Sequence, residues 1–110
     1  MSYIATHRFA RISARKVRPI ADLVRGKYAD DALDILRYMP QRGARLLEAV
    51  IKSAIGNAES SNERELENLI VVDARIDQGP MFKRVRPRAR GMAFMVKKRS
   101  AHIQVQLEVL

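Results

Sequence analysis

The sequence contains no cysteine, so neither a disulfide framework nor a metal site with thiolate ligands can form. No stretch approaches the ~18 consecutive apolar residues that a membrane-spanning helix needs. The basic residues near the N-terminus are not followed by the apolar segment of a secretion signal. We therefore expect a soluble, unprocessed protein of the reducing cytoplasm that has no membrane partner.

Sequence patterns for catalysis and cofactor binding are also missing. There is no G-x-G-x-x-G and no G-x-x-x-x-G-K-[ST] motif, which removes the usual phosphate-binding loops of nucleotide enzymes. Asp30 and Asp31 are better explained as residues at the positive end of a helix dipole than as metal ligands. The sequence thus predicts no metal, no cofactor and no small-molecule substrate.

Acidic residues are absent between Asp77 and Glu108, and this absence is the most informative one. The 30 residues between them include eight Lys or Arg. Net charge is +6 over residues 1–27, −4 over residues 28–77 and +7 over residues 78–110. Basic blocks without compensating acids are typical of segments that bind phosphates, where counterion release supplies most of the affinity. A nucleic acid is therefore the expected partner.

The 110 residues are 47% hydrophobic, which is enough for one domain with its own core. Helices are predicted over residues 14–25, from residue 30 or 31 to just before Pro40, and over 41–58, where apolar residues recur with helical spacing. Ser13 suits the N-cap of the first helix, and Gly26 suits a left-handed residue after it. Because Pro19 removes a backbone donor, we expect a kink or a late start in that helix.

Three strands are predicted, over residues 3–9, 70–76 and 103–109. The first has weak alternation and is expected at an edge of the sheet. In the second, Ile70, Val72, Ala74 and Ile76 are expected on one face, and the third alternates in the same way from Ile103 to Val109. Antiparallel pairing of the last two strands turns residues 77–102 into a hairpin with a reach on the order of 40 Å.

The hairpin has two dissimilar arms. Four arginines alternate with other residues, so an extended strand places them on one face; they are Arg84, Arg86, Arg88 and Arg90. Pro87 and Gly91 bracket the expected turn at the tip. The returning arm, residues 92–96, is apolar, and either packing within the ribbon or contact with a partner explains it.

Several motifs resemble those of one family, the bacterial large-subunit ribosomal protein L-twenty-two. They are A-R-K-V-R and A-D-L-V-R-G-K within residues 14–27, A-L-D-I-L at 32–36, S-A-I-G-N-A-E at 53–59 and G-P-M-F-K-R-V-R-P-R-A-R-G at 79–91. The resemblance implies an α+β fold with three helices packed on a small antiparallel sheet and a long protruding β-hairpin. It also implies a structural protein that binds large-subunit ribosomal RNA, supports early assembly and lines the nascent-peptide exit tunnel.

Two groups of basic residues are therefore predicted to bind ribosomal RNA. The first group belongs to the globular body and comprises Arg8, Arg11, Arg15, Lys16, Arg18, Arg25 and Lys27. The second belongs to the hairpin and comprises Lys83, Arg84, Arg86, Arg88, Arg90, Lys97, Lys98 and Arg99. The resemblance further implies a tunnel-lining tip, formed by Arg88, Ala89, Arg90, Gly91 and Met92. Neighbouring ribosomal proteins and the nascent polypeptide are the other implied partners.

Two alternatives use the same residues. The composition also fits a DNA-binding architectural protein of the histone-like kind, whose β-arm enters a groove of duplex DNA. A small ribonuclease is the enzymatic alternative, because His7 and His102 meet if the first and last strands are neighbours and two histidines can act as general acid and base. We prefer the RNA-binding, non-enzymatic interpretation.

Overall fold

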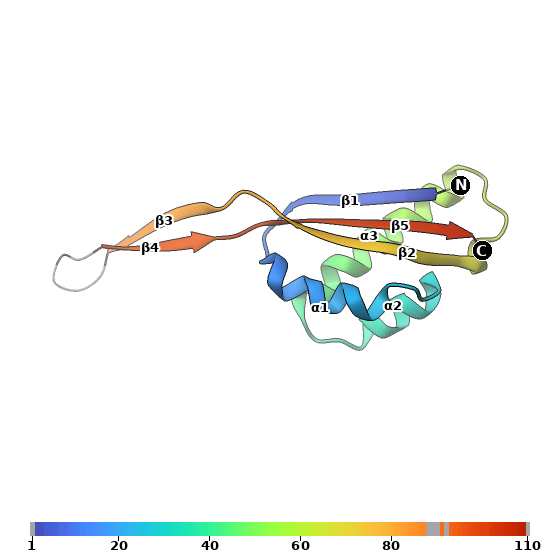
Figure 1. Ribbon diagram of the computed structural model, residues 1–110, viewed down its shortest axis with the longest axis horizontal. Helices are drawn as coiled ribbons and strands as arrows, with labels where there is room; N and C mark the ends of the chain where they lie inside the picture. Colours follow the sequence, from blue (N-terminus) through green and yellow to red (C-terminus); the bar gives the residue numbers. More distant parts are fainter. Residues whose placement is uncertain (1, 88–90, 92, 110) are drawn as a thin grey trace.

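The computed structural model describes residues 2–87, 91 and 93–109; the side chains of residues 82, 84, 86–87 and 93–96 are outside that description. The chain forms a body with a long arm, and both termini lie at the end of the body opposite the arm (Figure 1). Its elements are β1 (Ser2–Ala10), α1 (Ala14–Val24), α2 (Ala29–Arg37), α3 (Arg42–Ser60), the 3-10 helix η1 (Leu66–Asn68), β2 (Leu69–Gln78), β3 (Phe82–Pro87), β4 (Ala93–Lys98) and β5 (Ala101–Val109).

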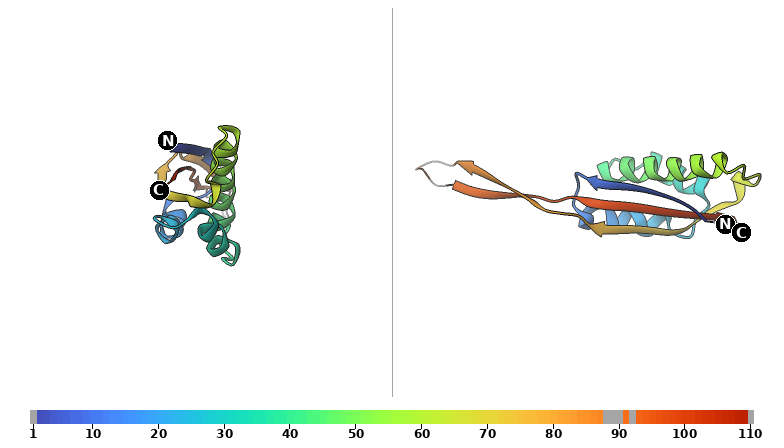
Figure 2. Two further views of the ribbon diagram at one scale, coloured as in Figure 1. Left: turned by 90° about the vertical axis from the view of Figure 1, so that its right-hand side faces the viewer. Right: turned by 90° about the horizontal axis from the view of Figure 1, so that it is seen from above.

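The body is built on a three-stranded antiparallel sheet in the order β1-β5-β2. The predicted pairing of the second and third strands is therefore confirmed, and the first strand lies at an edge as expected. Helix α3 packs over β1 and β5, α1 packs along β2, and α2 packs on α3. Figure 2 shows that the arm continues the long direction of the sheet and that the helices stay with the body.

The core lies between the helices and one face of the sheet. Leu47 and Ile51 of α3 are fully buried there, as the helical spacing predicts. In β5 the odd-numbered positions from Ala101 to Leu107 are buried, whereas Gln104 and Gln106 alternate with them on the other face and are only half-buried. No helix covers this second face in the described part of the chain, so we call it the open face.

The regular alternation predicted for β2 is wrong at Val72, which does not share a face with Ala74 and Ile76. Val71 pairs with Leu107 and Ala74 pairs with Val105, so three residue steps in β2 match two in β5. This β-bulge inserts one extra residue and reverses the alternation. Val71 is consequently buried, and Val72 is 37% exposed.

Helix α1 begins at Ala14 and runs through Pro19, so the late start considered for it is wrong. Ser13 occupies the predicted N-cap position, although its hydroxyl makes no capping hydrogen bond. Gly26 has φ +86, the left-handed conformation expected after the helix. The proline costs one intrahelical hydrogen bond, and the burial of Val17, Ile20 and Val24 in the core offsets that loss.

Among the described residues, strands β3 and β4 pair with each other and with no other strand, and they form the arm. They give the molecule extents of 64 × 25 × 16 Å, far from spherical for its size. The segment between them contains Gly91 with φ +71, which agrees with a turn in the predicted place. Residues 88–90 and 92 of the predicted tip lie outside the described part of the chain.

Candidate RNA interface

The fold brings together two basic segments that the acidic middle of the sequence separates. Ala10 at the end of β1 pairs with Ala101 at the start of β5, two residues after Arg99. Ala14 at the start of α1 lines the same pocket as Arg99, at the base of the arm. Arg8, Arg11, Arg15 and Lys16 flank these contact points along the chain. The N-terminal basic residues and the base of the hairpin therefore form one surface.

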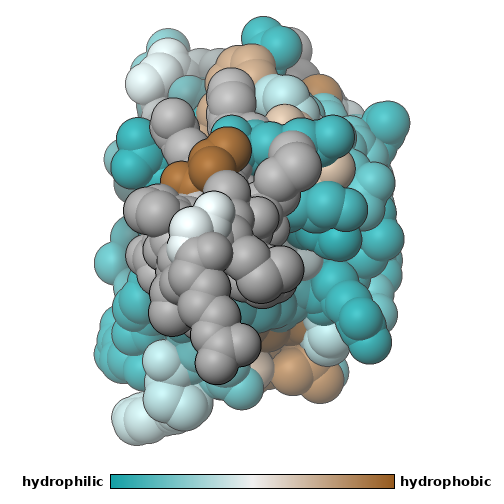
Figure 3. Space-filling model, turned by 90° about the vertical axis from the view of Figure 1, so that its left-hand side faces the viewer, coloured by the Kyte–Doolittle hydropathy of each residue, from teal (hydrophilic) through white to brown (hydrophobic). Residues whose placement is uncertain are grey.

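Every predicted RNA-binding side chain that the structure describes is exposed to solvent. These residues are Arg8, Arg11, Arg15, Lys16, Arg18, Arg25, Lys27, Lys83, Lys97, Lys98 and Arg99. Arg84, Arg86, Arg88 and Arg90 have side chains outside the described set. In the view along the arm, the coloured surface around it is mostly hydrophilic, with small hydrophobic areas (Figure 3).

Like charges face each other across the hairpin. Lys83 of β3 stands directly opposite Lys97 of β4, and both are exposed. Directly opposed like charges destabilise a strand pair, and a two-stranded ribbon is marginal in water even without them. Phosphates between or beside these lysines would remove the repulsion, so this pair favours a polyanion as the partner of the arm.

Two of the predicted RNA ligands, Arg18 and Arg25, also close the outer edge of the sheet. Arg25 donates from Nη2 to the carbonyl of Ala74 at 2.5 Å, and Arg18 donates from Nε and Nη2 to the carbonyl of Ile76, both at 3.3 Å. The backbone N–H of Gly26 donates to the carbonyl of Val71 at 2.7 Å. Unpaired edge groups favour association with other strands, and these contacts satisfy three carbonyl groups of that edge from within the chain.

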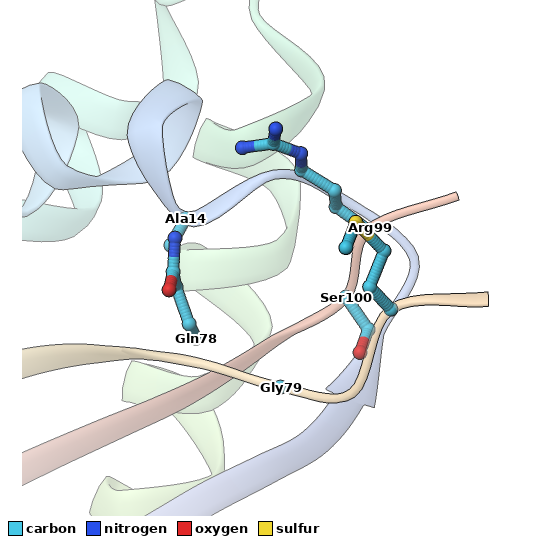
Figure 4. A pocket seen from close by; sticks show the side chains of 6 residues that line it. Ala14, Gln78, Gly79, Arg99 and Ser100 are labelled. Atoms are coloured by element: carbon cyan, nitrogen blue, oxygen red, sulfur yellow. The ribbon is translucent and has the colours of Figure 1, made fainter. Parts of the chain in front are cut away.

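A close joint links the body to the arm (Figure 4). The backbone N–H of Gly79 donates to the carbonyl of Ser100 at 2.9 Å, and the buried Ser100 hydroxyl donates to the carbonyl of Pro80 at 2.6 Å. Beside these bonds, a pocket of about 310 Å³ opens between the start of α1 and the two segments that connect the body to the arm. These two hydrogen bonds hold the base of the arm in a defined position next to the basic residues of the body.

Phe9 is a feature of this surface that sequence reasoning missed. It has φ +58, a conformation that costs an L-residue roughly 1–2 kcal/mol, and its side chain is 53% exposed. The backbone N–H of Phe9 donates to Nδ1 of His102 at 3.0 Å. The only available signal was an aromatic residue inside the basic run H-R-F-A-R at residues 7–11.

His7 and His102 do not form a pair, so the geometry required by the ribonuclease alternative is absent. Their strands are neighbours as that alternative needs, but His7 is paired with Ile103, whose side chain is in the core. His102 is one residue away and therefore lies on the open face. His7 instead lines a pocket with Ala49 and Ser53 of α3.

Several acidic residues lie in the body and away from the arm. Asp30 and Asp31 lie in the first turn of α2, as predicted from the helix dipole. Near the chain termini, the Tyr3 hydroxyl donates to Glu63 at 2.6 Å. That hydrogen bond raises the pKa of Tyr3 and lowers the pKa of Glu63. These acidic groups are separate from the basic residues at the base of the arm, where Asp77 of β2 is paired with Arg75.

Other kinds of site have little support in the described residues. Within ranges 2–87, 91 and 93–109, the side chains described include no group of three or more His, Asp or Glu placed to hold a metal ion. No described helix is both long enough and apolar enough to span a membrane.

Comparison with known proteins gives a consistent result. The family model described as "Ribosomal protein L22p/L17e" matches residues 5–108. The chain is 63% identical over 108 residues to large ribosomal subunit protein uL22 of Rhodopirellula baltica, with 94% of this chain and 91% of the relative covered. It is 48% identical over 104 residues to the protein of the same name from Caldicellulosiruptor saccharolyticus, with 94% and 85% covered.

Proposed function

The chain belongs to the ribosomal protein L22p/L17e family, and from that premise we propose that it binds large-subunit ribosomal RNA and supports assembly of the subunit. As a member of the family it is a structural constituent of the large ribosomal subunit in the cytoplasm and not an enzyme. The proposed RNA contacts are the two basic groups predicted from the sequence, in the body and in the hairpin.

The observation that carries the proposal is the meeting of both basic segments at the base of the arm. Pairing of Ala10 with Ala101 and the shared pocket of Ala14 and Arg99 make this surface continuous. Arginine presents planar, paired donors that match phosphate oxygens. The body then binds a folded RNA while the arm extends between the helices of that RNA. The shape of the RNA, and not its base sequence, gives the selectivity.

The arm carries the second part of the proposal. Residues 88–92 at its tip would line the tunnel through which the nascent polypeptide leaves, with neighbouring ribosomal proteins as further contacts. The arm's side chains that the structure describes are exposed, and the opposed Lys83 and Lys97 would be stabilised by anionic surroundings. Ribosomal RNA on both sides of the arm supplies them.

A binding competition tests the RNA part. The full chain is titrated into protein-free large-subunit ribosomal RNA, with duplex DNA of equal nucleotide content as competitor, over a range of salt concentrations. We expect the RNA to be bound in preference at every salt concentration, because the two basic surfaces match folded RNA and not a regular duplex. Preference for duplex DNA would reject the proposal in favour of the architectural alternative.

A second experiment tests the tip. Cysteine is placed at Gly91 in the otherwise cysteine-free chain, and assembled subunits carrying a stalled nascent peptide with one thiol-reactive group are isolated. We expect a crosslink between tip and peptide, whereas the same substitution at Tyr38, an exposed residue of the body, should give none. Equal crosslinking at the two positions would contradict a tunnel-lining tip.

A further inference from the structure

Phe9 combines an exposed aromatic ring with an unfavourable backbone conformation. Its φ of +58 belongs to the left-handed region, where glycine is normally found because a Cβ crowds the backbone. Within the described residues Asn62 is the other non-glycine residue with positive φ, and asparagine tolerates that region far better. Strain at a bulky residue persists where the surrounding structure enforces it, and it is frequent at ligand sites.

A bulge in β1 turns this ring outward. His7 pairs with Ile103 and Ala10 pairs with Ala101, so Arg8 and Phe9 together oppose His102. With regular pairing Phe9 would stand opposite Ala101 and enter the core. The extra residue gives that buried place to Ala10, which is 2% exposed, and leaves Phe9 in solvent.

Contacts with two neighbours hold the exposed ring in place. The ring of His102 lies edge-to-face with it, at 4.9 Å between centroids and 87° between planes. The backbone N–H of Phe9 donates to Nδ1 of the same histidine, and the Arg8 guanidinium carbon lies 5.4 Å from the Phe9 ring centroid. The ring is therefore fixed in direction while much of its surface remains open.

The electrostatic surroundings indicate what this ring would contact. Arg8 and Arg11 flank it in the chain, and the basic base of the arm is close. Asp77 stands opposite His102 in the sheet, but its carboxylate is already paired with Arg75 at 3.1 Å. An aromatic ring among arginines suits an unpaired nucleobase, which stacks on the ring while its phosphates meet the guanidinium groups.

We propose that Phe9 is a stacking platform for an unpaired base of ribosomal RNA beside the base of the arm, with Arg8 completing the site. This inference rests on the RNA binding proposed above and adds a single-stranded nucleotide to it. The bulge presents the ring, His102 orients it, and the basic surface attracts the strand.

Three substitutions of Phe9 separate stacking from other roles. Phe9→Gly fits φ +58 without strain, so we expect an unfolding temperature no lower than that of the parent. We also expect its affinity for protein-free large-subunit ribosomal RNA to fall by roughly 5- to 100-fold, the usual effect of losing one base–aromatic stack. Phe9→Tyr should retain the parent affinity, and Phe9→Leu should lose it despite its similar apolar size.

A control elsewhere in the body completes the experiment. Tyr38 is 84% exposed and follows α2, so Tyr38→Ala removes an even more accessible aromatic ring. RNA affinity should be unchanged in that variant. The comparison of Phe9→Tyr with Phe9→Leu stays informative even if Phe9→Gly fails to fold.

Other results would overturn the inference in distinguishable ways. No binding by the parent chain would reject the proposed function itself. Equal binding by the parent and Phe9→Leu would reject the stacking platform and leave the proposed function standing. Normal affinity of Phe9→Leu for free RNA combined with poor retention in assembled subunits would assign the ring to a neighbouring protein instead of a base.

Discussion

The Ser100 hydroxyl donates a 2.6 Å hydrogen bond to the carbonyl of Pro80 and so links the two segments of the chain that lead into and out of the arm. A Cβ built on Gly79 would lie 2.5 Å from Oγ of Ser100 and 3.3 Å from its carbonyl carbon and oxygen. The joint therefore has no room for a side chain at residue 79. Glycine is needed here for close approach, not for an unusual φ.

Gly79→Ala should consequently weaken the joint. The added methyl group displaces the Ser100 hydroxyl from Pro80, and the combined clash and lost hydrogen bond should cost roughly 1–3 kcal/mol. Thermal unfolding of the full chain measures the loss. Gly56→Ala is the matched control, because a Cβ there meets nothing within 4 Å, and replacing a helical glycine should stabilise by about 1 kcal/mol.

A second substitution identifies the cause of that loss. Ser100→Ala removes Oγ, so the double variant Gly79→Ala with Ser100→Ala should be less destabilised than the sum of the two single variants. Strictly additive losses would show that the Ser100 hydroxyl is not what excludes a side chain at Gly79.

Much of this fold follows from periodicity in the sequence, and the one wrong alternation and the missed Phe9 share one physical origin. The apolar spacing predicted α3 and its buried residues, such as Leu47 and Ile51, because helical spacing is local. The face of Val72 was predicted wrongly and the exposure of Phe9 was not predicted, because each residue lies at a bulge in an edge strand beside β5. Which residue is extra depends on the partner strand, and alternation within one strand does not encode it.

The sequence predicted which basic residues belong to the candidate site, but it did not predict how the fold arranges them. The charge pattern identified both basic segments, but their meeting at the base of the arm results from pairing of β1 with β5. The same limit applies to Arg18 and Arg25. Sequence reasoning treated all basic residues of the body alike, whereas these two donate to carbonyl groups of β2.

Substitution of Arg25 should therefore lower the stability of the protein, whereas substitution of Arg15 should lower its affinity for RNA. Arg25 bonds Ala74 and pairs with Asp22 at 2.7 Å, so Arg25→Gln should lower the free energy of unfolding by about 1 kcal/mol. No hydrogen bond or ion pair of the Arg15 side chain occurs among the described residues, so Arg15→Gln should weaken RNA binding with a stability change below about 0.5 kcal/mol. Urea unfolding and RNA titration of both variants measure the contrast. The same stability loss in both would contradict the assignment of Arg25 to the sheet edge.

Stability should depend on pH through Tyr3 and Glu63. The hydrogen bond from Tyr3 lowers the pKa of Glu63 below its ordinary 4.5, so this stabilisation is complete above pH 4.5 and is lost as pH falls through the lowered value. The same bond raises the pKa of Tyr3 above 10.0, so its part is complete below pH 10.0 and is lost at still higher pH. The Tyr3→Phe variant keeps the buried ring and loses the hydroxyl.

Urea unfolding of the parent and Tyr3→Phe at several pH values measures this dependence. The parent should be the more stable protein at neutral pH, and the difference should shrink as Glu63 becomes protonated. Glu63→Gln should flatten the acid dependence in the same way. A parent-to-variant difference that stays constant from neutral pH to pH 3 would rule out the linkage.

The arm should be separable from the core in both stability and binding. The side chains of the arm that the structure describes are exposed, and the buried residues described for the helix–sheet core lie in the body. Replacing the five basic residues of the outgoing arm with glutamine should therefore leave the unfolding temperature unchanged or slightly raised, since opposition between Lys83 and Lys97 is relieved. The five substitutions are Lys83→Gln, Arg84→Gln, Arg86→Gln, Arg88→Gln and Arg90→Gln.

Binding should respond in the opposite way. Affinity falls as salt rises, and each phosphate contact adds roughly 0.7–0.9 to the magnitude of the slope of log affinity against log salt concentration. The five-residue variant should therefore bind more weakly, and the magnitude of its slope should be smaller by up to about 4. Replacing Arg37, Arg42, Arg45, Lys52 and Arg64 of the central segment with glutamine removes the same charge as a control and should leave the slope nearly unchanged. A clear fall in the unfolding temperature of the arm variant would show that the basic arm and the core are coupled. Equal loss of slope in both variants would show that net charge alone, and not the position of the arm, governs RNA binding.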